Sequence, residues 1–374
     1  MRFPEFTEEW KKTKIGDITS KVGSGVTPKG GSAVYKTSGH LFIRSQNVGN
    51  GCFLLDDVAY IDEATHKKQI NTELKEGDVL LNITGASIGR TTVVNKNIEG
   101  GNVNQHVCII RLLEDFSPNY ICNYLLSYGG QKQIDSFQAG GNREGLNFEQ
   151  IRSIKFSVPS FKEQSKIASL LSLLDERIAT QSKIIEKLES LIKGIYEKVY
   201  NIDEEKFLPL GNIVKIQKGQ QINGEELSEQ GAYYVMNGGI APSGYFDSYN
   251  TLANTISISE GGNSCGYVQY NNVPFWSGGH CYTLTECKDS FNYKYLYHYL
   301  KYKELSIMAL RIGSGLPNIQ KKDLERFSIL DICKEKQNKM VYMLDDLSTK
   351  ISTERKILEN YEEQKKYLLS NLFI

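Results

Sequence analysis

Two stretches of the chain share one apolar pattern and decide the fold: residues 167–199, IASLLSLLDERIATQSKIIEKLESLIKGIYEKV, and residues 340–372, MVYMLDDLSTKISTERKILENYEEQKKYLLSNL. In the first stretch, apolar side chains recur in alternating steps of four and three residues, the heptad spacing of a helix that packs along one face. Adding 173 to each position gives the same pattern in the second stretch. The first seam consists of Ile167, Leu171, Leu174, Ile178, Gln181, Ile185, Leu188, Ile192, Ile195 and Val199, and the second of Met340, Leu344, Leu347, Ile351, Glu354, Leu358, Tyr361, Lys365, Leu368 and Leu372.

Each stretch predicts a helix of about 40 residues, roughly 60 Å long at 1.5 Å per residue. Ser160 and Glu163, which follow Pro159, form a capping-box pattern that predicts the start of the first helix. Because an apolar stripe of this length must be covered, the two helices are expected to pack against each other. Gln181 and Glu354 hold the fifth place of each seam, where they either fix the register of the pair or reach solvent.

The rest of the chain is also duplicated, with the same landmarks in the same order in both halves. These landmarks are Gly16-Asp17-Ile18 with Gly211-Asn212-Ile213, the segment from Val79 through Gly85 to Gly89 with that from Ile256 through Gly262 to Gly266, His106 with His280, Asn119–Leu125 with Lys294–Leu300, and Gly145-Leu146 with Gly315-Leu316. A duplication related by a pseudo-twofold axis would lay the helices antiparallel, with one globular domain at each end. We therefore predict an α+β protein with two α/β recognition domains, residues 1–158 and 201–331, separated by two long antiparallel helices, residues 159–200 and 332–374, that form an intramolecular coiled coil.

Composition limits the function classes. The 374 residues are 40% hydrophobic, and no apolar run approaches the ~18 residues of a membrane span, so no membrane partner is expected and the chain is expected in the cytoplasm. The seven cysteines form no CxxC pair and the five histidines no HExxH cluster, so no metal is predicted. The 44 basic residues balance the 44 acidic ones, so net charge by itself gives no support to DNA binding.

The sequence also lacks the motifs of a self-sufficient DNA-modifying enzyme. Its eight prolines are never adjacent, which excludes an NPPY motif, and no GxGxxG opens a βαβ unit. Residues 23–29, GSGVTPK, lack the Gly-Lys-Ser/Thr ending of a phosphate loop and contain a proline, so a plain turn is favoured. We assign neither a catalytic residue nor a cofactor site to the chain.

The chain resembles the specificity subunit of a type I restriction-modification system over essentially its whole length. The resemblance rests on Trp10 with Ile15-Gly16-Asp17, Gly25-Val26-Thr27-Pro28, Phe42-Ile43-Arg44-Ser45-Gln46-Asn47-Val48, Gly77-Asp78-Val79-Leu80-Leu81, Ser87-Ile88-Gly89-Arg90, and Val158-Pro159 before Lys162-Glu163-Gln164. The second copy departs from this pattern, with Lys336-Gln337 in place of Glu163-Gln164 and no Thr-Pro turn.

The resemblance implies a non-catalytic subunit with two target recognition domains, each of which recognises one half of a split site in double-stranded DNA. It implies that the helices act as a spacer and as a docking surface for two methyltransferase (modification) subunits, which restriction subunits join later. S-adenosylmethionine, ATP and Mg²⁺ would then be used by the partner subunits.

Candidate DNA contacts lie in polar, glycine-punctuated loops, where recognition residues concentrate on a rigid core. In the first domain they are Thr27, Lys29, Arg44, Gln46, Asn47, Ser87, Arg90, Asn104, Gln105, Asn142 and Arg143, and in the second Lys215, Lys218, Gln220, Gln221, Asn237, Asn263, Ser264 and Arg311. Residues 219–287 contain no Lys or Arg, so the arginine–guanine contact is impossible there and Asn, Gln and Ser are the expected readers. The alternative is that these Asn and Gly residues only shape turns.

Two other function classes are left open at this point. A coiled-coil adaptor whose globular ends bind proteins would share the heptad pattern, and footprinting on a two-part DNA site would distinguish it. A self-contained nuclease or methyltransferase would show activity as the purified chain alone.

Overall fold

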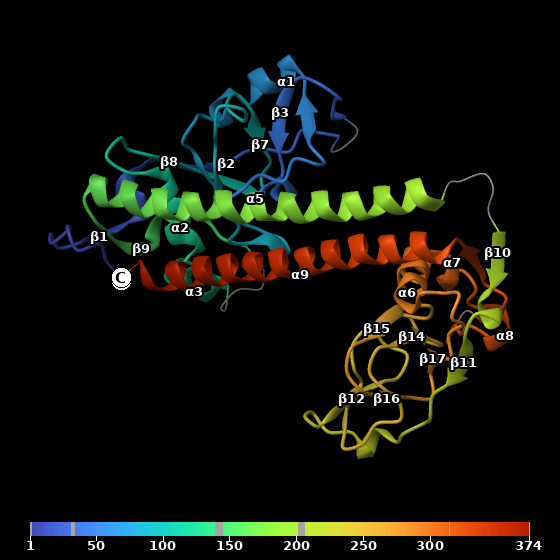
Figure 1. Ribbon diagram of the computed structural model, residues 1–374. Helices are drawn as coiled ribbons and strands as arrows, with labels where there is room; N and C mark the ends of the chain where they lie inside the picture. Colours follow the sequence, from blue (N-terminus) through green and yellow to red (C-terminus); the bar gives the residue numbers. More distant parts are fainter. Residues whose placement is uncertain (1, 31–33, 139–144, 201–205, 314, 374) are drawn as a thin grey trace. The chain divides into compact units, whose positions relative to one another are not determined.

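The computed structural model describes residues 2–30, 34–138, 145–200, 206–313 and 315–373 (Figure 1). It divides into two compact units, Met1–Ser182 with Lys356–Ile374 and Lys183–Arg355. The division falls within the two long helices, so each unit holds one globular domain and a part of both helices.

The first domain is built on a four-stranded antiparallel sheet in the order β2-β8-β5-β6. A second sheet, β4-β3-β7, forms from the connecting segments, with β3 and β7 parallel, and a separate pair, β1-β9, joins the two ends of the domain. The strands are β1 (Lys11–Lys14), β2 (Thr19–Ser24), β3 (His40–Ile43), β4 (Ala59–Ile61), β5 (Val79–Asn82), β6 (Thr91–Val93), β7 (Asn102–Val103), β8 (Val107–Leu112) and β9 (Lys155–Val158), and the helices are α1 (Glu63–Lys68), α2 (Pro118–Leu126), α3 (Tyr128–Gln138) and α4 (Phe148–Ser153).

The second domain repeats this plan strand for strand. Its four-stranded sheet has the order β11-β17-β14-β15, its smaller sheet the order β13-β12-β16 with β12 and β16 parallel, and its terminal pair is β10-β18. The strands are β10 (Lys206–Pro209), β11 (Lys215–Lys218), β12 (Tyr233–Met236), β13 (Gly244–Phe246), β14 (Thr255–Ser259), β15 (Val268–Asn271), β16 (Trp276–Ser277), β17 (Cys281–Thr285) and β18 (Ser328–Asp331), and the helices are α6 (Tyr293–Tyr302), α7 (Glu304–Met308) and α8 (Lys321–Glu325).

The hydrogen bonds fix which residues of the two copies correspond. In both domains one inner strand of the larger sheet, here called the central strand, ends in a turn with two left-handed glycines. The first domain has Gly85 and Gly89 after β5, and the second has Gly262 and Gly266 after β14. These four φ angles lie between 71° and 93°, a region that glycine enters without steric cost. The predicted correspondence of these landmarks is thereby confirmed.

One predicted correspondence is wrong. The backbone of Leu146 donates to Ile83, and the equivalent bond in the second domain runs from Ile319 to Glu260. Leu146 therefore matches Ile319, not Leu316, and the burial agrees, because Leu146 and Ile319 are buried whereas Leu316 is 87% exposed. The Gly-Leu dipeptide recurs three residues before the structural match, so the two dipeptides do not occupy equivalent positions.

Each domain leads into a long helix, α5 (Phe161–Tyr200) and α9 (Lys334–Asn371). A buried glutamine fastens the start of each: the Gln164 side chain accepts from Ser117 N and donates to Pro159 O, and Gln337 does the same with Asn292 N and Ile332 O. Glu163 is engaged differently from the predicted capping box, because both of its carboxylate oxygens accept from the Arg2 guanidinium at 2.8 Å.

The two helices run antiparallel in both units. In the first unit Asp175 of α5 pairs with Lys365 of α9, and Arg177 donates to the Tyr361 hydroxyl. In the second unit Glu189 of α5 pairs with Arg355 of α9 at 2.6 Å. In the first unit rising positions on α5 thus meet falling positions on α9, and Figure 1 shows the same antiparallel order within the second unit.

The seam positions lie on the covered face of each helix. Ile167, Leu171, Leu344 and Ile351 are buried, and all the remaining seam side chains are buried or half-buried. Gln181 is 7% exposed and does not reach solvent, whereas Glu354 is half-buried. The fold class predicted from the sequence, two α/β domains in an internal repeat with two long antiparallel helices, is confirmed.

Candidate nucleic-acid interface

The predicted contacts of the first domain include a linked set of loop residues. The Gln105 side-chain oxygen accepts from Thr27 N at 2.9 Å, and its amide nitrogen lies 3.2 Å from Nε2 of His106. A 2.6 Å hydrogen bond joins Nδ1 of His106 to the Thr84 hydroxyl. The loops that follow β2 and β5 and precede β8 therefore meet at these side chains.

A second set is organised by Asp57. Arg44 donates to Asp57 O at 2.8 Å and lies over the Tyr35 ring, with the guanidinium carbon 5.6 Å from the ring centroid. Gln46 donates to the Asp57 carboxylate at 2.7 Å. The structure therefore holds Arg44 and Gln46 side by side on one acidic loop residue.

Two of the predicted readers shape loops instead of facing solvent. Asn47 is 1% exposed, accepts from Arg44 N and donates to Leu54 O and Asp57 O. Asn104 is 7% exposed, and its side-chain oxygen accepts from His106 N. A buried amide with its groups bonded to backbone has little freedom to contact a base.

The other predicted residues of this domain vary in accessibility. Lys29 and Arg90 are exposed, and Ser87 is half-buried in the turn between β5 and β6. Asn142 and Arg143 lie outside the described residues.

In the second domain, Gln221 and Asn237 gather around a glycine pair. Asn237 accepts from the backbone N–H of His280, and a Cβ at Gly278 would lie 2.6 Å from the Asn237 amide oxygen. A Cβ at Gly279 would lie 2.3 Å from the Gln221 amide oxygen. Glycine is therefore required at both positions for these two side chains to lie where they do.

The remaining polar candidates of this domain lie on neighbouring loops. Gln220 is exposed, and its carbonyl accepts from the Trp276 indole at 3.0 Å. Asn263 is exposed and Ser264 half-buried in the loop between β14 and β15.

Two of the three basic candidates of the second domain have acidic partners. Lys215 pairs with Glu286 and Lys218 with Glu260, each at 2.6 Å, whereas Arg311 is exposed. These carboxylates offset part of the positive charge that would attract a phosphate. Around these two lysines the surface is therefore polar and close to neutral in charge.

The chain matches one protein family in both halves. Residues 7–190 and 203–363 fit the family model described as the type I restriction modification DNA specificity domain. The chain belongs to this family. Its members are the specificity subunits that recognise the DNA sequence in type I restriction-modification systems.

Individual relatives agree over most of the length. A chain named as a type I specificity subunit from Mycoplasma genitalium is 24% identical over 78% of this chain and 79% of its own. One named as the specificity subunit of the type I restriction enzyme MjaX from Methanocaldococcus jannaschii is 22% identical over 98% and 93%. A crystal structure of a type I S subunit from M. genitalium has the same fold, with a TM-score of 0.72, 19% identity and coverage of 100% and 97%.

Two functional candidates of this specificity subunit were missed in its sequence. His106 and His280 occupy equivalent positions directly before β8 and β17, among the predicted readers of their domains. The signal was present, because the repeat aligns the two histidines. Their placement beside Gln105 and Asn237 depends on loop conformation, which the sequence does not reveal.

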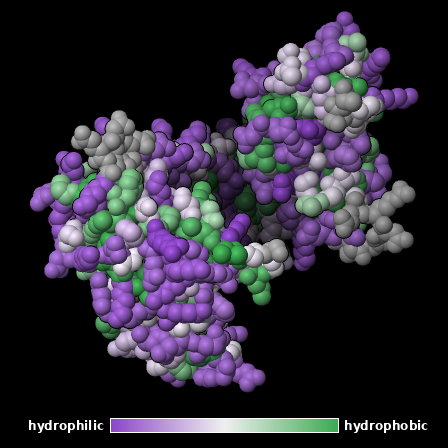
Figure 2. Space-filling view, turned by 90° about the vertical axis from the view of Figure 1, so that its right-hand side faces the viewer, coloured by the Kyte–Doolittle hydropathy of each residue, from purple (hydrophilic) through white to green (hydrophobic). Residues whose placement is uncertain are grey.

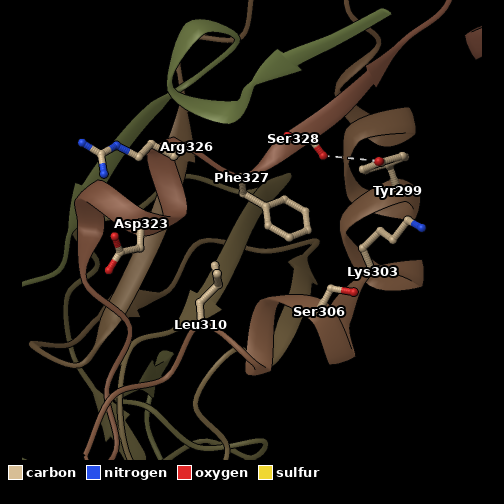
Figure 3. Close-up of a pocket in the computed structure, with 8 residues that line it drawn as sticks. All are labelled: Tyr299, Lys303, Ser306, Leu310, Asp323, Arg326, Phe327 and Ser328. Carbon is tan, nitrogen blue, oxygen red and sulfur yellow. Dashed lines mark hydrogen bonds between the residues drawn. The ribbon is translucent and has the colours of Figure 1, made fainter. Parts of the chain in front are cut away.

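A separate pocket of about 520 Å³ lies among α6, α7 and α8 (Figure 3). Figure 3 shows the Phe327 ring turned into it and the Arg326 side chain turned away. Asp323 is the one carboxylate among its lining residues, so the pocket offers no pair of carboxylates for acid-base chemistry.

Neither a metal centre nor a membrane span is found in the described residues. No group of three or more His, Cys, Asp or Glu side chains there is placed to hold a metal ion. No helix in the same residues has the length and apolarity needed to cross a membrane. The surface drawn in Figure 2 is mostly hydrophilic, with apolar residues in small patches.

Proposed function

We propose that each of the two domains recognises one half of a split site in double-stranded DNA. The observation that supports this proposal is the duplication. Both domains place polar side chains at equivalent ends of equivalent strands in their four-stranded sheets. A reader of one continuous site would have no need for two such surfaces. Because the loop residues of the two copies differ, the two half-sites are expected to differ in sequence.

The long helices then serve as the spacer and as the docking surface for two methyltransferase subunits, with restriction subunits joining afterwards. Several large apolar side chains on these helices are exposed, including Leu173 at 59%, Leu191 at 51% and Tyr342 at 79%. Contiguous exposed apolar patches mark surfaces that a protein partner covers, and we propose that these side chains contribute to such patches. We propose that these partner subunits carry out the catalysis, using S-adenosylmethionine, ATP and Mg²⁺. We also propose that the complex acts in the cytoplasm, where the cell's DNA is.

The test is to reconstitute the chain with its methyltransferase subunits and to map methylated adenines on genomic DNA. The expected result is pairs of methylated adenines in a motif of two defined halves separated by a fixed gap of undefined sequence. Methylation of a continuous motif would refute the split-site proposal. Activity of the chain alone would refute the division of labour.

A further inference from the structure

Glu260 is a buried carboxylate at the end of the central strand of the second domain. It directly follows β14 and is 8% exposed. Its Oε1 accepts from Lys218 Nζ at 2.6 Å and from the Tyr282 hydroxyl at 3.0 Å. Burial and the nearby Glu260 carboxylate raise the pKa of Tyr282, so this hydroxyl keeps its proton and remains a donor.

The second oxygen of this carboxylate, Oε2, does not share these hydrogen bonds. Glu260 Oε2 is buried and has no hydrogen-bond partner within the described part of the chain. A buried acceptor without a hydrogen bond destabilises the folded chain. Its presence therefore suggests that Glu260 has a role other than stability. His280 Nδ1 lies 3.5 Å from this oxygen, within ion-pair distance but without the geometry of a hydrogen bond.

The first copy shows that the fold does not require this carboxylate. Ile83 N donates to His106 O and Glu260 N donates to His280 O, so Glu260 stands where the first domain has a buried Ile83. By the same strand registers, Lys218 and Tyr282 stand where the first domain has Ser24 and Cys108. The same sheet is thus built once with an apolar residue and once with an ionic group at this point.

The surroundings of His280 belong to the candidate interface. Its side chain is 60% exposed, and its backbone N–H donates to Asn237, one of the predicted readers. It is also the only histidine in residues 219–287, which contain no Lys or Arg. Its ring therefore offers a kind of hydrogen-bonding group that no other side chain in this segment provides.

We propose that His280 is a specificity-determining base contact of the second domain and that Glu260 positions its ring. This inference rests on the proposed function. In this proposal a small turn of the ring lets Nδ1–H donate to Glu260 Oε2, which favours the tautomer with the proton on Nδ1 and leaves Nε2 as an acceptor. In the major groove an acceptor pairs with the amino group of adenine or cytosine. His280 thus selects an amino-bearing base at one position of one half-site.

The test uses the reconstituted methyltransferase complex, whose unmodified form must first methylate a split site. If it does not, the proposed function fails before this inference is examined. His280→Ala, Glu260→Ile and the double variant are then assayed on a library randomised in both half-sites. Glu260→Ile introduces the residue that the first domain has at this position, Ile83. If the isoleucine impairs folding, Glu260→Gln removes the charge while keeping the shape of the side chain. Glu325→Gln on α8, paired with Lys321, is the charge-matched control.

Loss of one good base contact should lower discrimination at one base pair by about 5-fold to 150-fold. His280→Ala should show this loss in one half-site only, with the other half-site and the control unchanged. Glu260→Ile should weaken discrimination at the same base pair, and the double variant should be no worse than His280→Ala because Glu260 acts through His280.

Three results would overturn the inference. The first is unchanged site choice in His280→Ala. The second is uniform weakening across all sequences with a smaller salt dependence, which would indicate a phosphate contact. The third is an additive effect of the two substitutions, which would give Glu260 a purely structural role.

Discussion

Breaking the ion pair between Asp78 and Arg111 should destabilise the first domain by an amount that the structure allows to be worked out. Arg111 donates to both Asp78 oxygens at 2.7 Å, and Asp78 also accepts from Lys75 N. The two side chains are 1% and 22% exposed. Removing one partner of a buried pair costs about 3 to 5 kcal/mol, because it leaves the other charge unpaired.

The two single substitutions should differ in size. Asp78→Thr leaves a guanidinium that water partly reaches, so we expect the lower end of that range, about 3 kcal/mol. Arg111→Thr leaves an almost fully buried carboxylate, so we expect the upper end, about 5 kcal/mol. For a unit of this size, 1 kcal/mol corresponds to about 2 to 4 °C, so Asp78→Thr should lower the melting temperature by about 6 to 12 °C.

The second copy supplies the matched control. The strand registers place Thr255 and Thr285 at the positions of Asp78 and Arg111. The double variant D78T/R111T imports this neutral pair and should be less destabilised than the sum of the single variants, with a coupling energy of about 2 to 3 kcal/mol. Hydrogen exchange of β5 and β8 in the full chain, with β14 and β17 as internal reference, measures each loss. Single variants that each cost under about 1 kcal/mol, or a double variant equal to their sum, would refute the reasoning.

Three further predictions concern pH, gap length and salt. Burial lowers the pKa of His298 from its ordinary 6.5, so below about pH 6.5 the unfolded chain binds more protons than the folded chain. Thermal unfolding should therefore show the second unit losing stability as pH falls below about 6.5. A flat profile, or the same slope in His298→Gln, would contradict this. Despite the opposing effect of burial, hydrogen bonds from Lys294 and His298 lower the pKa of Asp345, so a second loss should follow below pH 3.8. Inserting one heptad into each long helix adds about 10 Å and should lengthen the recognised gap by about three base pairs in methylation mapping, and an unchanged gap would remove the spacer role. Because its net charge is zero, the isolated chain should bind DNA with a much shallower salt dependence than the complex, and equal slopes would show that it makes the phosphate contacts itself.

The helices and the repeat could be predicted because their signals are periodic. A heptad face can be recognised from the spacing of apolar residues alone. All ten positions of each seam are buried or half-buried in the structure. The glycine landmarks also held, because a left-handed turn requires the same residue type in both copies. The Gly-Leu match failed because a single dipeptide carries neither spacing nor a backbone requirement.

The candidate interface was predictable as a set of loops but not as a set of side chains. Whether an asparagine faces solvent or turns inward depends on the backbone groups around it, and Asn47 and Asn104 turned inward to bond such groups. Glu260 could not have been selected from the sequence, because it follows an apolar strand where the first copy has isoleucine. The repeat aligns Glu260 with Ile83, but the burial of Glu260 and its contact with His280 are visible only in the structure.

Both domains hold a buried carboxylate on the central strand of the larger sheet, but at opposite ends. Asp78 precedes β5 and is held by Arg111, whereas Glu260 follows β14 beside the candidate readers. Each site is neutral or apolar in the other copy, so neither charge is a requirement of the fold. The position on the strand therefore separates their roles: changing the Asp78 pair should alter stability and leave site choice intact, and changing Glu260 should alter site choice. If D78T/R111T changed the methylated sequence, the assignment of recognition to one end of this sheet would fail for both domains.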